Sequence, residues 1–212
     1  MKKEAKVVDR EIRMATKNFR AIESEDGKMV VEGYAIVFDS PATWFGFTET
    51  ISRDALKECD MSDVPLKYNH EDSHLILART RNNSLQLEVD DVGLKIRAEL
   101  IDTSANVDIY KSIKAGLLDK MSFEFTIPED GEVWDLNTNT RTITKIDRLW
   151  DVSVVDTPFY DSSSIYARAL SSLDNEKKKL DNLKEQNEKR QIIEDIKNLL
   201  KGGTKNVFEF TV

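Results

Sequence analysis

The strongest constraint on the fold is a series of short β-type segments separated by turn signals, which runs to about residue 166. These segments are rich in β-branched and aromatic residues and span residues 29–37, 84–89, 94–100, 121–127, 141–146 and 149–155. Residues 90–93 predict a hairpin turn between the second and third of them. Helices are expected over residues 52–58, with Ser52 as N-cap, and over 106–115, closed by Gly116. The pattern predicts a mainly β (α+β) domain, either an antiparallel barrel or a sandwich decorated by helices.

The composition changes abruptly in the last 45 or so residues. Residues 174–201 are rich in Lys, Glu, Asp, Asn and Gln, lack Gly and Pro, and carry apolar residues at near-helical spacing. A gap from Lys184 to Gln191 interrupts any continuous heptad, which predicts one or two helices, exposed or partner-bound, and not a long coiled coil. Gly202 and Gly203 are expected to end the helix, and residues 207–212 to form an extended tail. The predicted organisation is a domain over residues 1–169 and a polar helical tail with a terminal β-like segment over 170–212.

Residue counts exclude several kinds of site. One cysteine and two histidines cannot build a disulfide framework, a multi-cysteine metal site or a three-histidine metal site. The net charge of −8 argues against nucleic acid as a partner. Because no apolar run approaches the roughly 20 residues of a membrane span and the residues after Met1 are charged, we expect no membrane partner and a reducing, cytoplasm-like compartment. Cys59 lies between Glu58 and Asp60, which raise a thiol pKa and disfavour a nucleophilic role.

Two residues combine a position suited to chemistry with an ordinary structural interpretation. His70 lies at the end of a short apolar segment beside polar loop residues, where it could act as a general base or simply be a surface-loop histidine. Ser122 lies in the segment 120–127, where alternation places the apolar side chains on one face and Ser122 on the polar face. A serine in such a position is common in strands. Neither residue identifies a site by itself.

Asp151 lies in the last of the β-type segments. Alternation places Trp150, Val152 and Val154 toward the core and Asp151 on the opposite face among apolar neighbours. A carboxylate there requires a hydrogen-bond partner. An imidazole is one candidate, in which case the acid fixes the tautomer and the imidazole takes a serine proton. An arginine such as Arg141 or Arg148 is the other, and the spacing leaves both open.

Five blocks of sequence follow one another in the order and spacing of the phage prohead maturation protease family. They are residues 32–38, 47–56, 69–70, 116–125 and 150–158, and the chain resembles this family over roughly residues 13–169. Members of the family are serine endopeptidases related to the herpesvirus assemblin. The resemblance implies an antiparallel β-barrel of about six to seven strands wrapped by short helices.

The resemblance also implies roles for particular residues. His70 resembles the family's general base and Ser122 its nucleophile. Asp151 stands where the family often has a glutamate, and is expected to be the third member in spite of its shorter side chain. Arg79 is the candidate group for binding the oxyanion. His74 matches no position of the motif and is expected to be a loop residue.

Two further positions depart from the family pattern. Ala78 precedes Arg79 where a glycine is often found, and Glu124 follows the serine block where a glycine is often present. These departures support an alternative of another class, a catalytically inert barrel that acts as a structural scaffold of the procapsid. Residues 123–126 recur as residues 208–211, so the terminal segment could pair near the strand that carries Ser122.

The function that the resemblance implies is capsid maturation by peptide-bond hydrolysis. The enzyme would act inside the procapsid in the host cytoplasm and cleave scaffold or the scaffold-like region of the major capsid protein, with self-cleavage as a further option. No metal or organic cofactor is expected. Assemblins dimerise through helices, which makes a homodimer an option for this chain.

Overall fold

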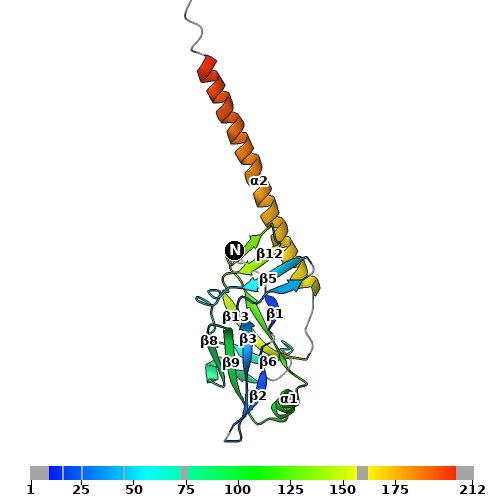
Figure 1. The fold of residues 1–212 in the computed structure, drawn as a ribbon. Helices are drawn as coiled ribbons and strands as arrows, with labels where there is room; N and C mark the ends of the chain where they lie inside the picture. Colours follow the sequence, from blue (N-terminus) through cyan, green and yellow to red (C-terminus); the bar gives the residue numbers. More distant parts are fainter. Residues whose placement is uncertain are drawn as a thin grey trace, which may run out of the picture. The chain divides into compact units, whose positions relative to one another are not determined.

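The computed structural model describes residues 10–15, 17–24, 26–44, 46–72, 76–156 and 162–203. It divides into two compact units, Met1–Tyr166 and Ala167–Val212. The described residues form mostly β-strands, with two α-helices (Figure 1). The prediction of a mainly β, α+β protein is therefore confirmed.

The strands of the first unit form three sheets (Figure 1). The strands are β1 Glu11–Ala15, β2 Arg20–Glu23, β3 Met29–Val37, β4 Ala42–Trp44, β5 Phe47–Ile51, β6 Pro65–Tyr68, β7 Ala78–Arg79, β8 Leu85–Val89, β9 Gly93–Leu100, β10 Lys120–Thr126, β11 Glu132–Asp135, β12 Thr140–Ile143 and β13 Arg148–Val155. A short 3-10 helix, Thr80–Asn82, follows β7. One sheet has the order β1-β10-β13-β6-β7, the second β2-β3-β9-β8 and the third β11-β12-β5-β4.

This strand arrangement differs from the expected barrel of six to seven strands. The described residues contain thirteen strands, several of them only two to four residues long. Most neighbours pair antiparallel, but β12 with β5 and β13 with β6 pair parallel. Since the pairings among the described strands leave three open sheets, closure into a barrel stays a prediction.

The apolar core lies against one face of the five-stranded sheet. Phe123 of β10, Val152 of β13 and Leu66 of β6 are almost fully buried there, together with Val31 of β3 and Ile96 of β9. Burying these side chains is the main favourable contribution to folding. It also fixes which residues of β10 and β13 face the other side of the sheet, because successive side chains alternate.

Helix α1, Ser104–Lys114, confirms the predicted helix before β10. Thr103 caps it, accepting a hydrogen bond from the backbone N–H of Asn106 at 3.3 Å. Gly116 adopts a left-handed conformation with φ of 73° after the helix, and its N–H bonds to the carbonyl of Ile113 at 3.0 Å. The glycine therefore ends the helix and directs the chain toward β10.

The predicted helix over residues 52–58 is wrong, because this segment consists of successive turns. The N–H of Ala55 bonds to the carbonyl of Ser52, and the N–H of Lys57 to that of Asp54, each at 3.1 Å. The carbonyl of Ala55 accepts from the N–H of Ile146 at 2.8 Å. A helix would need that carbonyl for its own ladder, so the tertiary contact replaces the helical bond.

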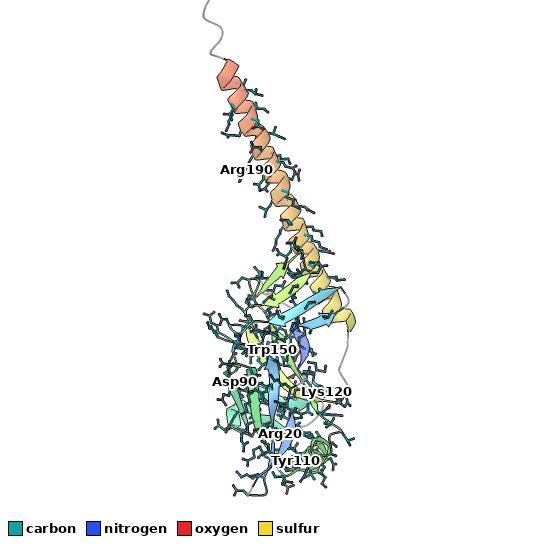
Figure 2. The ribbon with its side chains drawn as sticks, in the orientation of Figure 1. Arg20, Asp90, Tyr110, Lys120, Trp150 and Arg190 are labelled. Carbon is teal, nitrogen blue, oxygen red and sulfur yellow. The ribbon has the colours of Figure 1, made fainter. Side chains whose placement is uncertain are left out.

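A β-bulge changes the expected alternation at the start of β13. Glu124 is opposite Asp151 and Phe125 is opposite Leu149, so Trp150 is the extra residue (labelled in Figure 2). Leu149 is fully buried and Trp150 only half-buried. The prediction that Trp150 points to the core is therefore wrong, and Leu149 lies in the core instead. Asp151 keeps its expected position on the face opposite the core.

The described residues of the second unit belong to one long helix, which begins in the last residues of the first unit. Helix α2, Ser162–Gly203, is continuous over 42 residues and includes the glycine pair, so an end of the helix at this pair stays a prediction. Its apolar residues beyond residue 179, such as Leu183, Ile192 and Leu199, are exposed. Residues 207–212 lie outside the described residues. Within the described part of the chain, no helix combines the length and apolar character needed to cross a membrane.

Candidate active site

The structure brings Ser122, His70 and Asp151 into direct contact. Ser122 comes from β10, Asp151 from the neighbouring strand β13, and His70 from the loop that follows β6 on the other side of β13. His70 Nε2 lies 2.6 Å from Ser122 Oγ, and His70 Nδ1 lies 2.6 Å from Asp151 Oδ1. Three residues that are far apart in the sequence therefore form one hydrogen-bonded chain.

The loop at His70 is held against β13 by backbone geometry. Asn69 and His70 both adopt the left-handed region, with φ of 52° and 58°, which is uncommon for residues other than glycine. The N–H of Asn69 bonds to the carbonyl of Val154 at 2.9 Å, and the N–H of His70 donates to Ser153 Oγ at 3.2 Å. Asn69 Oδ1 accepts from the N–H of Asp156 at 3.2 Å. These bonds turn the chain so that the imidazole reaches Ser122.

The hydrogen bonds determine which nitrogen of His70 carries a proton. An ionised Asp151 can only accept, so Nδ1 donates and Nε2 is the acceptor. Ser122 is only 3% exposed, and its hydroxyl has two acceptors within reach, His70 Nε2 at 2.6 Å and the carbonyl of Arg13 at 2.9 Å. The serine proton can therefore pass to the imidazole without a large movement of either side chain.

Asp151 remains charged despite being fully buried. Burial alone would raise its pKa, but the hydrogen bond from His70 and the nearby charges of His70 and Lys67 outweigh burial and lower the pKa. Lys67 Nζ lies 3.3 Å from Asp151 Oδ2. Ser153 Oγ also donates to Asp151 Oδ1, at 3.0 Å. The carboxylate is thus oriented toward His70 from several sides.

The arginines that sequence reasoning offered as partners for Asp151 bind other acids. Arg148 lies 3.7 Å from Asp60. Arg141 is almost fully buried and binds Glu11 and Glu49, with its Nη1 2.8 and 2.7 Å from their Oε2 atoms. The choice between an imidazole and an arginine is therefore decided in favour of His70.

The acids around Arg141 belong to a buried ion cluster that links β1 to β5 and β12. Arg13 of β1 binds Glu49 of β5, and its Nη2 lies 2.6 Å from Glu11. Burial alone would raise the pKa of Glu11, but Arg141 and Arg13 outweigh it and lower the pKa to about 2. Since Met14 of β1 is opposite Ser122 in the ladder, the cluster anchors the strand whose backbone contacts the serine hydroxyl.

Arg79 does not join the cluster of Ser122, His70 and Asp151. Its guanidinium binds both carboxylate oxygens of Asp63, one of them at 2.7 Å from Nη2. Among the described residues, no hydrogen bond or ion pair links Arg79 to the three. His74 lies outside the described residues.

Cys59 has the environment predicted for an unreactive thiol. Burial, and then the charges of Asp60 and Asp147, raise its pKa to about 12. At neutral pH the side chain is therefore a thiol and not a nucleophilic thiolate.

Ser153 contacts two members of the site and was missed as a functional residue. The sequence signal that could have found Ser153 is alternation, because a residue two positions from Asp151 on the same strand lies on the same face of the sheet. A serine on a strand is too common for that signal to be decisive. The structure adds what the sequence lacked, namely that the backbone of His70 lies against this hydroxyl.

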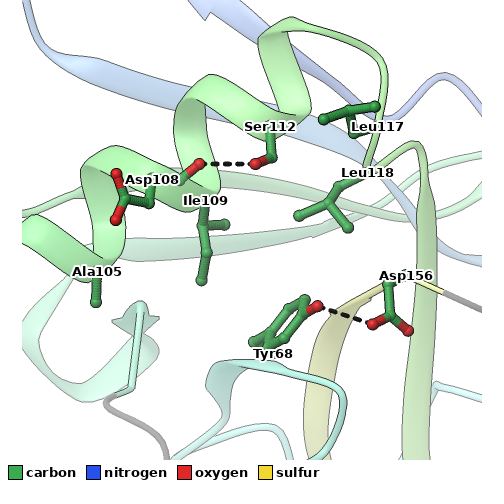
Figure 3. Close-up of a pocket in the computed structure, with 8 residues that line it drawn as sticks. All are labelled: Tyr68, Ala105, Asp108, Ile109, Ser112, Leu117, Leu118 and Asp156. Atoms are coloured by element: carbon green, nitrogen blue, oxygen red, sulfur yellow. Dashed lines mark hydrogen bonds between the residues drawn. The ribbon is translucent and has the colours of Figure 1, made fainter.

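A pocket of about 510 Å³ lies near the start of β10 and the ends of β6 and β13 (Figure 3). It is lined by Tyr68, Ala105, Asp108, Ile109, Ser112, Leu117, Leu118 and Asp156. Tyr68 donates a hydrogen bond to Asp156 Oδ2 at 2.9 Å on one side of the pocket (Figure 3). Tyr68 packs against the core, whereas its neighbour Lys67 faces Asp151. None of the residues that line the pocket belongs to the cluster of Ser122, His70 and Asp151.

Comparison with known proteins identifies the family. The model of the caudovirus prohead serine protease family matches residues 16–179. The structure is similar to that of the bacteriophage T4 capsid assembly protease, gp21, with a TM-score of 0.48 and 13% sequence identity over 69% of this chain and 96% of that chain. No curated protein matches this chain. Because the family model covers most of its length, this chain belongs to the caudovirus prohead serine protease family, whose members are capsid maturation peptidases.

Proposed function

We propose that this chain is a serine endopeptidase with Ser122 as nucleophile, His70 as general base and Asp151 as the orienting acid. The observation that carries the proposal is the position of His70, whose two ring nitrogens each lie 2.6 Å from one of the other two side chains. A nucleophile, a base and an orienting acid in hydrogen-bond contact are the elements of a serine hydrolase site.

The geometry supports a two-step reaction. In the first step Ser122 Oγ attacks the scissile carbonyl carbon while His70 Nε2 accepts the serine proton, and Asp151 stabilises the resulting imidazolium. His70 then gives this proton to the leaving amine, the C–N bond breaks, and an acyl ester forms on Ser122. In the second step His70 takes a proton from water, the hydroxide attacks the ester, and the proton returns to Ser122 as the acid product leaves.

Family membership supports a protein substrate from the phage head. We infer that the enzyme acts inside the procapsid in the host and cleaves scaffold or the scaffold-like region of the major capsid protein. Self-cleavage and a homodimer are further parts of this proposal. We also propose that the three sheets close into a barrel. A catalytically inert scaffold has no need of an aligned serine, imidazole and carboxylate, so the geometry favours the enzyme.

Co-expression with the major capsid protein of the same phage tests the proposal. Intact-mass spectrometry should show discrete fragments of the capsid protein with the wild-type chain and only the intact species with Ser122→Ala. Ser112→Ala is the matched control, since the Ser112 hydroxyl bonds to the helical carbonyl of Asp108 at 2.9 Å and, among the described residues, to none of the three proposed catalytic groups. Fragments that persist in the Ser122→Ala sample would rule out the proposed nucleophile.

A further inference from the structure

A second carboxyl group lies directly against the proposed orienting acid. Glu124 of β10 is the cross-strand partner of Asp151 and sits on the same face as Ser122, two residues away. Its side chain is 15% exposed, and the charge of Asp151 and a side-chain hydrogen bond with it are among the causes that raise the pKa of Glu124. Two carboxylates cannot share a hydrogen bond without a proton between them.

The oxygen atoms of Asp151 show where that proton is needed. Oδ1 accepts from His70 Nδ1 at 2.6 Å and from Ser153 Oγ at 3.0 Å. The buried Oδ2 makes no well-aligned hydrogen bond among the described residues, and its charged neighbour is Lys67, whose Nζ lies 3.3 Å away. A proton on Glu124 adds a second donor on this side of the carboxylate.

Charged groups reach Glu124 from β13, from the residue before β1 and from the loop after β6. Burial first, and then the charge of Asp151 and the hydrogen bond with it, raise the pKa of Glu124. Arg10, whose Nη1 lies 3.3 Å from Glu124 Oε2, and His70 act in the opposite direction without reversing the shift. Lys67, the remaining charge at Asp151, is itself paired with Asp72 at 2.7 Å. Together these effects favour the protonated form of Glu124 more than that of an exposed glutamate.

We propose that Glu124 is a positioning residue: its protonated carboxyl donates to Asp151 Oδ2 and holds the Asp151 carboxylate in the orientation that accepts from His70 Nδ1. The proposal rests on the proposed function, because it concerns the orientation of the same base. Glu124 then acts through Asp151 and does not contact the substrate. When Glu124 ionises, it loses the donor and repels Asp151.

Two substitutions of similar size separate the donor from mere packing. Glu124→Gln keeps a neutral donor at every pH, so its kcat should stay within about threefold of the wild type. Glu124→Leu removes the donor and should lower kcat by about 10- to 100-fold with little change in KM, as expected for a hydrogen bond to a charged group. As pH rises above the pKa of Glu124, kcat of the wild type should fall relative to that of Glu124→Gln.

A control variant tests whether the ion pair with Arg10 accounts for the effect. Arg10→Gln removes that pair but leaves the hydrogen bond to Asp151, and should keep kcat near that of the wild type. Equal kcat in Glu124→Leu and the wild type would overturn the proposal. Equal losses in Glu124→Gln and Glu124→Leu would overturn it too, since the amide should replace the protonated acid.

An NMR titration of the ¹³C-labelled Glu124 carboxyl in a Ser122→Ala background gives a readout independent of catalysis. Its signal, assigned by its absence in Glu124→Gln, should titrate above the usual glutamate pKa of about 4.3. The midpoint should fall when Asp151→Asn removes the neighbouring charge. A midpoint within the ordinary glutamate range overturns the proposal for Glu124 even if Ser122 is the nucleophile. A raised midpoint supports a protonated Glu124 even if Ser122→Ala proves active.

Discussion

Ser122 and Ser153 are directly opposite each other in the ladder between β10 and β13, and both hydroxyls contact His70. One hydroxyl lies at Nε2, where a proton is to be transferred, and the other binds the backbone N–H of the same residue. A single pair of antiparallel strands thus carries the proposed nucleophile and one group that fixes the position of its base. Asp151, two residues before Ser153, completes the arrangement on the same face.

Ser153→Ala should weaken catalysis without removing it. The substitution deletes the acceptor of the His70 N–H and a donor to Asp151, a combined loss of about 1 to 2 kcal/mol. We expect kcat to fall by about tenfold with KM nearly unchanged, measured by steady-state cleavage of a peptide substrate. A variant with wild-type kcat and a wild-type circular dichroism spectrum would show that Ser153 does not position the base.

Asp151→Asn should have a much larger effect. The amide cannot stabilise the imidazolium, and its NH₂ group favours the wrong tautomer of His70. We expect kcat to fall by about 10⁴-fold, the size of loss seen when a triad acid is replaced by its amide. Asp151→Glu keeps the charge on a longer side chain and should lose less. If the asparagine variant stayed within tenfold of the wild type, Asp151 would not be the orienting acid.

Glu11→Gln should destabilise the fold through the buried ion cluster. Because the folded pKa of Glu11, about 2, lies below its ordinary value of 4.5, its contribution is present above pH 4.5 and is lost as pH falls toward 2. The difference corresponds to about 3 kcal/mol. The free energy of unfolding in urea should therefore drop by about this amount at pH 7, and the variant should lose less stability between pH 5 and pH 3 than the wild type.

Glu99→Gln is the matched control for that experiment. Glu99 pairs with Lys28 at 3.0 Å, but both side chains are half exposed, so the pair should contribute about 0.5 kcal/mol or less. A Glu11→Gln variant as stable as Glu99→Gln at pH 7 would contradict the structural role of the cluster.

Local patterning was enough to predict the elements whose residues match their surroundings. The β-branched run in β3, the turn before β9 and the capped helix α1 were all predicted from neighbouring residues. Strand β1 was not, because Glu11 and Arg13 are typical of an exposed segment. They are buried only because Glu49 and Arg141 reach them from other strands, which no local pattern records.

The site shows the same division between local and long-range information. Alternation placed Ser122 on a polar face and Asp151 on the face opposite the core, but the resemblance to a family, and not spacing, joined them to His70. The bulge at Trp150 reversed the faces of two residues, since one inserted residue shifts the alternation. Ser153 and Glu124 gained meaning only from the register between β10 and β13, which depends on tertiary packing.

Covalent labelling of Ser122 by a fluorophosphonate tests the central claim most directly. Such a reagent phosphonylates a serine hydroxyl activated by a base, and peptide mass spectrometry locates the adduct. We predict a single adduct on Ser122 in the wild type, none in His70→Ala, and wild-type labelling in Ser112→Ala. Absence of the adduct from Ser122, or equal labelling of Ser122 with and without His70, would contradict the account.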